Sequence, residues 1–176
     1  HAFEIVGMSK GAQLVLAASS RKKIGVFATE FTINSGAHKA AILAADSGAD
    51  VYPQACPKFV PLIEGEQFGS VEVRAAVAEY AAPLKAAGID TLILSCTHYP
   101  FIQKEIEREF GSEVTVIDPA DATAQDTKAV LAAEGLLRSE GTGSLEVCFT
   151  ADVERGARIA ARVLPQGKCL FKEIKL

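Results

Sequence analysis

Short apolar segments alternate with longer helical segments along most of this chain, and this alternation limits the fold more than any other feature. Buried strands are predicted at residues 23–28, 50–53, 90–95, 114–117, 144–150 and 168–174. Helices are predicted at 35–47, 70–87, 100–110, 121–133 and 152–164. Continuous apolar strands separated by helices of this length are typical of a parallel sheet covered on both faces. The expected fold class is therefore α/β.

In sheets of this kind, ligands bind outside the carboxyl ends of the strands. That rule selects three loops for a functional site, at residues 29–34, 54–68 and 96–100. No G-x-G-x-x-G or Walker-type loop opens a helix, so no motif supports a nucleotide site. We therefore expect a site built from side chains at the ends of these strands.

Composition excludes several classes of partner. The 176 residues are 49% hydrophobic, enough for one large or two small domains, and 18 basic against 22 acidic residues give a formal charge of −4. This mild acidity does not favour binding to nucleic acid or to an anionic membrane. No apolar run reaches the roughly 18 residues that span a bilayer, and the first residues do not resemble a signal peptide. A cytoplasmic protein is expected.

The four cysteines form no C-x-x-C pair, so neither a disulfide framework nor a structural zinc site is expected. With three histidines and no H-x-x-x-H spacing, no metal site is predicted. Cys148 and Cys169 lie inside apolar strands and are expected to be buried, inert thiols. Cys56 is expected to pack the base of the loop that follows the second strand. His38 is expected on the polar face of a helix.

Cys96 ends the clearest strand and comes immediately before a helix. The positive end of a helix dipole stabilises a thiolate at such a position. His98 is close enough in sequence to orient the thiol, to protonate a substrate group or to pair with the thiolate. Thr97 offers a hydroxyl and a backbone N–H suited to a carboxylate. The alternative is a small residue packed at a strand–helix turn beside a solvent-facing histidine.

The other two loops also carry polar side chains. Thr29 and Thr32 could present hydroxyls to a carboxylate or an ammonium group, or could serve only local turn and capping roles. Ser35 is predicted to cap the helix over 35–47. Glu64 ends a loop anchored by apolar residues and prolines, and could pair with a histidine and set its protonation state. Glu66 is a weaker candidate, and most loop glutamates are simply solvated.

Taken together, the segments resemble the glutamate racemase family within the wider aspartate/glutamate racemase superfamily. The most specific element is Leu-Ser-Cys-Thr-His-Tyr-Pro at 94–100. The others are Ile-Gly-Val-Phe-Ala-Thr-Glu-Phe-Thr-Ile-Asn-Ser-Gly at 24–36, Gln-Ala-Cys-Pro-Lys-Phe-Val-Pro-Leu-Ile-Glu at 54–64 and Val-Ile-Asp-Pro-Ala at 116–120. Their order and spacing match the family over nearly the whole chain.

The resemblance implies a parallel-sheet sandwich of racemase type, with two similar domains and the active site between them. It implies catalysis without a cofactor, by two thiols that face each other across the α-carbon. Cys96 matches the thiol that deprotonates L-glutamate, and His98 and Glu64 match the histidine beside that thiol and its acidic partner. Thr97 matches a substrate-contacting residue. Thr29 and Thr32 match positions near the substrate and the first thiol.

One departure concerns the beginning of the family pattern. The Asp-Ser-Gly-x-Gly-Gly element and the Asn-Thr-Ala-type strand end with the first cysteine do not occur in this chain. Cys56 does not replace that cysteine, because the family pattern places it in the Gln-Ala-Cys-Pro loop. We therefore expect residues 1–8 to be a linker, 9–117 a complete racemase domain and 118–176 the C-terminal portion of a second, incomplete domain. With one active-site thiol, the chain alone is expected to be inactive and to expose apolar surface.

The function expected from the resemblance is interconversion of L- and D-glutamate, which supplies D-glutamate for peptidoglycan. An aspartate or hydantoin racemase of the same superfamily is an alternative. Nucleophilic catalysis by Cys96 and His98 through a covalent intermediate is a second, and an inactive fragment that only binds an amino acid is a third. Glutamate is the expected small-molecule partner, and the protein could form a homodimer.

Overall fold

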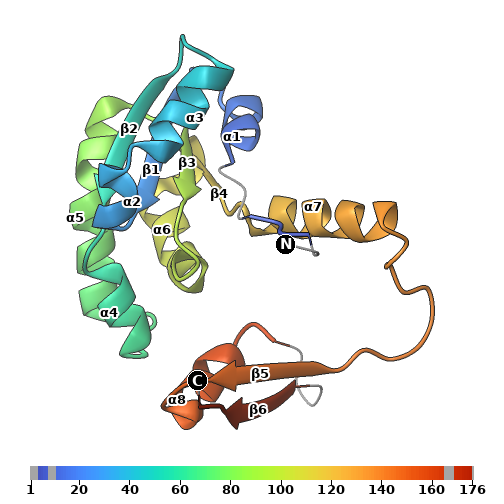
Figure 1. The fold of residues 1–176 in the computed structure, drawn as a ribbon. Coiled ribbons are helices and arrows are strands. Elements are labelled where there is room, and N and C mark those ends of the chain that lie inside the picture. The colour runs from blue at the N-terminus through green and yellow to red at the C-terminus, as the bar shows by residue number, and fades with distance from the viewer. Residues whose placement is uncertain (1–3, 8–10, 165–168, 176) are drawn as a thin grey trace. The chain divides into compact units, whose positions relative to one another are not determined.

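The computed structural model describes residues 4–7, 11–164 and 169–175, which form two compact units (Figure 1). The first unit is His1–Gly135 and the second is Leu136–Leu176. The predicted boundary between residues 117 and 118 separates a complete from an incomplete racemase domain and is a different division of the chain. It stays a prediction. Each unit is described by itself below.

The first unit is built on a four-stranded sheet with the order β2-β1-β3-β4, in which all neighbours are parallel. This confirms the parallel α/β sheet predicted from the alternating pattern. β2 continues two residues beyond its predicted end, because Gln54 and Ala55 pair with Phe27 and Ala28 of β1. The strands are β1 (Lys23–Ala28), β2 (Asp50–Ala55), β3 (Thr91–Leu94) and β4 (Thr115–Ile117).

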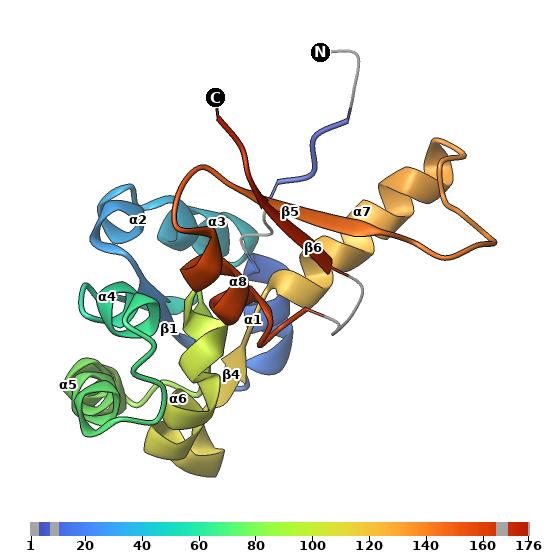
Figure 2. The same cartoon turned by 90° about the horizontal axis from the view of Figure 1, so that it is seen from below.

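Helices cover both faces of this sheet, as Figures 1 and 2 show. The longest, α5, has the predicted ends: the Ser70 hydroxyl accepts a hydrogen bond from the Val73 N–H at 3.1 Å, and Gly88 ends the helix with φ 70°. The helices are α1 (Ala12–Ala18), α2 (Glu30–Asn34), α3 (Ala37–Ala45), α4 (Phe59–Glu64), α5 (Val71–Ala87), α6 (Gln103–Phe110) and α7 (Ala120–Ala133), with 3-10 helices η1 (Tyr99–Ile102) and η2 (Gly111–Glu113).

Two hydrophobic clusters fill the space on either side of the sheet. Leu92 and Leu94 of β3 belong to the cluster that includes α4, α5 and α6, whereas Ile93 belongs to the cluster that includes α1 and α3. Because successive strand side chains point to opposite faces, a strand covered on both faces is mostly apolar, and in β3 the polar exception is the fully buried Thr91 at its start. Phe59 anchors the first cluster, with ring centroids 5.2 Å from Tyr80 and 5.1 Å from Tyr99 in edge-to-face contact.

Two predictions about the segment after β1 are wrong. Within residues 29–34, Glu30–Asn34 form helix α2 rather than a loop, and the Thr29 hydroxyl caps it by accepting a hydrogen bond from the Thr32 N–H. Ser35 is not the N-cap of the next helix: it is the C-cap of α2, where its hydroxyl donates to the Thr32 carbonyl at 2.7 Å and accepts a hydrogen bond from the Ala37 N–H at 3.3 Å. Gly36, with φ 66°, then reverses the chain so that α3 starts at Ala37. Helix α4 likewise lies within the segment 54–68 that was expected to be a loop.

The second unit contains a parallel pair of strands and one helix: β5 (Leu145–Phe149), β6 (Cys169–Glu173) and α8 (Val153–Ala160). These confirm the predicted elements, except that residue 168 of the last predicted strand lies outside the described residues. The prediction that Cys148 and Cys169 are buried is wrong, since Cys148 is exposed and Cys169 is half-buried. A two-stranded sheet with one helix has too little cover to bury an apolar strand on both faces.

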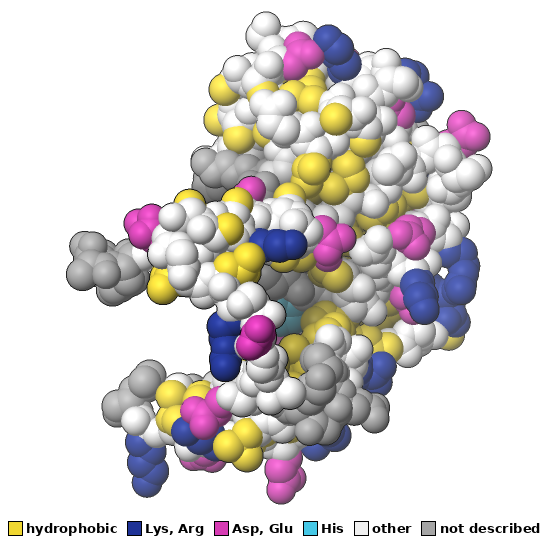
Figure 3. Space-filling model, turned by 90° about the vertical axis from the view of Figure 1, so that its right-hand side faces the viewer, with side chains coloured by type: hydrophobic (Ala, Val, Ile, Leu, Met, Phe, Trp, Pro, Cys, Tyr) yellow, Lys and Arg dark blue, Asp and Glu magenta, His cyan; other side chains and the backbone are white. Residues whose placement is uncertain are grey.

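Large apolar side chains reach solvent in the second unit. Val163 is 65% exposed and Leu170 61%, and Leu136, Leu137 and Leu145 are also exposed. Hydrophobic side chains are accordingly visible on the surface in Figure 3. Exposed apolar side chains are what an incomplete domain would leave uncovered, and the incompleteness of this domain stays a prediction.

A buried carboxylate ties the end of α1 to the start of β3. Asp90 is 7% exposed. Its oxygens accept hydrogen bonds from the hydroxyls of Ser19 at 2.5 Å and Ser20 at 3.2 Å, and from the Arg21 N–H at 2.6 Å. Burial alone would raise the pKa of Asp90, but these hydrogen bonds outweigh it and hold the pKa below its ordinary value.

We expect Asp90→Asn to lower the free energy of unfolding by about 2 kcal/mol at pH 7, because hydrogen bonds to a charged acceptor are lost. Since the folded pKa of Asp90 is lowered, the stabilisation is complete well above the ordinary aspartate value and is lost as the pH falls through the folded pKa. The difference from wild type should therefore shrink in acid. Urea unfolding across this pH range measures it, with exposed Asp50 as the Asn control. A difference that is equally large in strong acid would contradict this account.

Candidate active site

The three predicted loops meet at the carboxyl edge of the first unit's sheet. β1 lies between β2 and β3, so the ends of all three strands are neighbours. The pairing continues past β3 and β2: the Ser95 N–H donates to the Phe27 carbonyl at 2.8 Å, and the Cys56 N–H donates to the Ala28 carbonyl at 2.9 Å. These hydrogen bonds fix the backbone at the points where the segments after β3 and β2 leave the sheet.

Cys96, His98 and Glu64 lie together at this edge. The Nε2 atom of His98 is 2.7 Å from Oε1 of Glu64, and the Nδ1 atom is 4.0 Å from Sγ of Cys96. Because a carboxylate oxygen accepts hydrogen bonds, Nε2 is the donor to Glu64. The neutral ring then presents an unprotonated Nδ1 to the thiol. The imidazole can accept the thiol proton while the carboxylate stabilises the resulting positive charge.

Packing fixes both partners of this pair. Glu64 is the last residue of α4, which is anchored by the fully buried Phe59 and Ile63. His98 precedes η1, where fully buried Tyr99 packs its ring against Phe59 and donates its hydroxyl to the Cys56 carbonyl at 3.4 Å. The histidine and the glutamate thus come from separate segments that share one aromatic contact.

The two cysteines of the first unit differ in environment. Cys56 is 1% exposed, and burial raises the pKa of its thiol far above the ordinary range. This confirms the prediction that Cys56 packs the base of its loop. Cys96 is only partly buried and contacts the edge of the same hydrophobic cluster. Of these two thiols, Cys96 is therefore the one suited to chemistry.

Thr29 and Thr32 are paired with each other. Their hydroxyl oxygens are 3.0 Å apart, and Thr29 also caps α2. The local capping role considered for these residues is therefore present at Thr29. Thr97 is exposed at the turn between Cys96 and His98. The substrate contacts of Thr29, Thr32 and Thr97 stay predictions.

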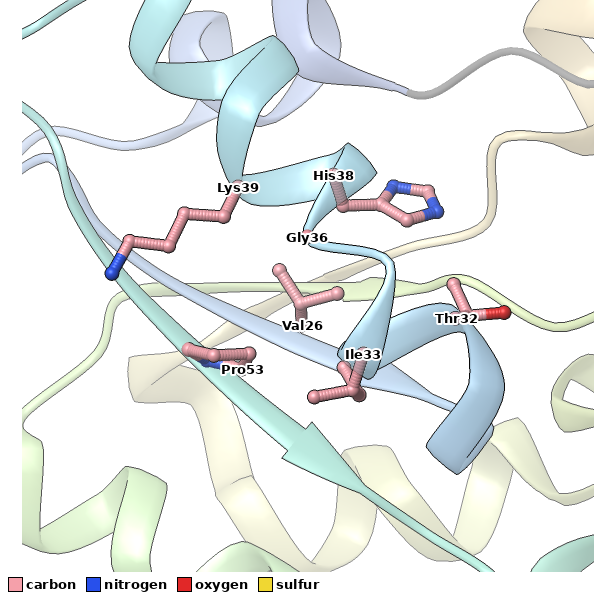
Figure 4. Close-up of a pocket in the computed structure, with 7 residues that line it drawn as sticks. All are labelled: Val26, Thr32, Ile33, Gly36, His38, Lys39 and Pro53. Carbon is pink, nitrogen blue, oxygen red and sulfur yellow. The ribbon is translucent and has the colours of Figure 1, made fainter.

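A pocket of about 290 Å³, open to solvent, lies beside this edge between α2, α3 and the first two strands (Figure 4). Thr32 and His38 project toward the same side in Figure 4, whereas Lys39 points the other way. His38, expected on a polar face, is half-buried, and its Nδ1 atom is 3.4 Å from the Ser95 hydroxyl. Sequence reasoning missed this contact, because the two residues are 57 positions apart. The pocket is lined by Val26, Thr32, Ile33, Gly36, His38, Lys39 and Pro53.

Within residues 4–7, 11–164 and 169–175, no group of three or more His, Cys, Asp or Glu side chains has the arrangement of a metal site. In the same part of the chain, none of the helices has the length and apolar character needed to cross a membrane.

The fold and this edge define a parallel α/β protein with a thiol beside a carboxylate-bound imidazole. Residues 5–127 match the family model described as Asp/Glu/Hydantoin racemase. The chain is 38% identical over 176 residues to a glutamate racemase of Lysinibacillus sphaericus strain C3-41, covering 99% of this chain and 66% of that protein. It is 45% identical over 128 residues to a glutamate racemase of Lactiplantibacillus plantarum, covering 72% of this chain and 47% of that protein.

Solved structures give the same result. Glutamate racemase isoform RacE1 from Bacillus anthracis superposes with a TM-score of 0.88 at 29% identity, covering all of this chain and 65% of that one. The glutamate racemase from Francisella tularensis in complex with D-glutamate has a TM-score of 0.82 at 26% identity, and the match covers 95% of this chain and 61% of that one. This chain belongs to the Asp/Glu/Hydantoin racemase family, as its motifs predict. It spans less than two thirds of the length of these relatives.

We expect the folded chain at pH 8 to react with iodoacetamide at Cys96 at least about tenfold faster than at Cys56, because a buried thiol stays protonated and inaccessible. Peptide mapping by mass spectrometry after timed quenching measures both rates. In concentrated urea the two rates should become similar, which shows that the fold is the cause. Equal rates in the folded chain would contradict the proposed difference between the thiols.

Proposed function

We propose that this chain is the part of a glutamate racemase that supplies the thiol acting on L-glutamate. The observation that supports this most is the Cys96 thiol facing Nδ1 of His98, whose Nε2 is bound to Glu64. The similarity to proteins named glutamate racemase adds to it, as does a structural neighbour in complex with D-glutamate. We place the reaction in the cytoplasm, where it supplies D-glutamate for peptidoglycan.

The proposed first step is proton removal from the α-carbon. The Cys96 thiolate takes the α-proton, and the electron pair of the broken C–H bond remains on the α-carbon and spreads into the substrate carboxylate. The imidazole of His98 stabilises the thiolate beforehand, and Glu64 stabilises the imidazolium. A donor on the opposite face of the carbon then returns a proton and inverts the configuration.

The α-proton of an amino acid is weakly acidic, so the developing negative charge needs fixed hydrogen-bond donors. Thr97 is proposed to hold the substrate carboxylate through its hydroxyl and backbone N–H, since it lies between Cys96 and His98 at an exposed turn. Thr29 and Thr32 are proposed to contact the substrate from the end of β1. Their mutual hydrogen bond fixes both hydroxyls before substrate arrives.

We further propose that residues 9–117 form one complete racemase domain and that 118–176 belong to a second. The second active-site thiol would come from a segment of the longer relatives that this chain does not span. Alternatives within the family are racemisation of aspartate or of hydantoins. Chiral chromatography of products from L-glutamate, L-aspartate and hydantoins, with a polypeptide that contains both thiols, separates these substrates.

We expect the 176-residue chain alone to form no D-glutamate from L-glutamate, because inversion needs an acceptor on one face of the α-carbon and a donor on the other. Incubation in D2O followed by chiral chromatography and mass spectrometry measures both product and deuterium uptake. Deuterium in recovered L-glutamate without D-glutamate would fit removal and return by one thiol. Sustained D-glutamate formation would contradict the two-thiol mechanism.

A further inference from the structure

The turn that presents Cys96 is held from a second side by a histidine outside the Cys96–His98–Glu64 arrangement. Ser95 immediately precedes Cys96, and its hydroxyl lies 3.4 Å from Nδ1 of His38. Both residues are half-buried. The contact joins the first turn of α3 to the residue that follows β3, two segments that are far apart in the chain.

The backbone on both sides of Cys96 is already fixed. The Ser95 N–H donates to the Phe27 carbonyl, and the Tyr99 N–H donates to the Cys96 carbonyl at 3.1 Å. These bonds hold the backbone at Ser95 and after Cys96, but they do not hold the Ser95 side chain, which lies directly before the thiol-bearing residue. The contact between the Ser95 hydroxyl and His38 restrains that side chain and ties the residue before Cys96 to α3.

His38 is itself in a well-determined position. It lies one residue into α3, which starts after the left-handed Gly36 and packs through fully buried Ile42 against the sheet. The imidazole lines the pocket beside the sheet edge, on the same side as Thr32 (Figure 4). A ring anchored by a packed helix can hold a partner more firmly than a side chain on an open loop.

We propose that His38 is a positioning residue for Cys96: by holding the Ser95 hydroxyl, it fixes the turn so that the thiol faces His98. This deepens the proposed racemase function, on which it rests, because it gives the thiol two histidines with separate tasks. His98 exchanges a proton with sulfur, whereas His38 acts only through Ser95 and does not touch the substrate.

Matched substitutions at position 38 separate this role from simple packing. The Nδ1 atom of histidine and the polar atoms of the asparagine amide are both attached to Cγ, so His38→Asn can keep the contact with Ser95. His38→Leu places carbon at those positions and removes it. Ser95→Ala removes the other partner, and Lys39→Ala, at a neighbouring exposed residue that also lines the pocket, serves as the control.

The readout is the rate of Cys96 alkylation by iodoacetamide at pH 7, measured by peptide mass spectrometry on the full 176-residue chain. Cys148 and Cys169 of the second unit are internal references in the same sample. We expect His38→Leu and Ser95→Ala each to slow Cys96 by about threefold or more, as for residues in one hydrogen-bonded unit, and the double variant to be no slower than either. His38→Asn and Lys39→Ala should react like wild type.

Three outcomes would overturn the proposal: wild-type reactivity in His38→Leu, effects that multiply in the double variant, or His38→Asn behaving like His38→Leu. Thermal unfolding of each variant checks that the first unit is folded, and His38→Asn with Ser95→Ala provides a second route if the leucine variant does not fold. The rate of Cys96 alkylation can be measured without racemase activity. If racemisation itself were disproved, the alkylation result would still decide whether His38 positions Cys96.

Discussion

The candidate site depends on the central place of β1 in the parallel sheet. β1 pairs with β2 on one side and β3 on the other, and its last carbonyls, on Phe27 and Ala28, accept hydrogen bonds from Ser95 and Cys56. Backbone pairing therefore brings residues far apart in the chain to one edge, and the packing of α4 against η1 places Glu64 and His98 there. The end of a strand, and not a helix, therefore defines where the Cys96 thiol lies.

On this frame, burial and hydrogen bonding give the two nearby cysteines different properties. Cys56 is enclosed and its thiol is held protonated by desolvation, so it contributes packing. Cys96 is partly open and faces an imidazole whose other nitrogen is bound to a carboxylate. The same aromatic cluster, through Phe59 and Tyr99, supports both Glu64 and His98. A change in that cluster would therefore reach the thiol without touching it.

Much of the fold is predictable from sequence because its signals are local. The apolar runs give β1 and β3, and Ser70 and Gly88 mark both ends of α5. Ser35 misleads because two helices follow β1 where one is predicted: Thr29 caps α2, and Gly36 takes the N-cap position of α3. Cys148 misleads because the apolar pattern of a strand does not say how many layers cover it. The Glu64–His98 pair is foreseeable from the family motifs, but the His38–Ser95 contact is not, since it depends on how α3 packs beside β3.

The central claim is that Cys96 removes the α-proton of glutamate. It is tested most directly by deuterium uptake at the α-carbon of L-glutamate in D2O, in a polypeptide that contains both active-site thiols. Cys96→Ser should lower the exchange rate by about 10²- to 10⁴-fold, the range typical of a lost acid–base group, whereas Cys56→Ser should retain it. Exchange in Cys96→Ser that equals exchange in Cys56→Ser, with both variants folded, would contradict the account.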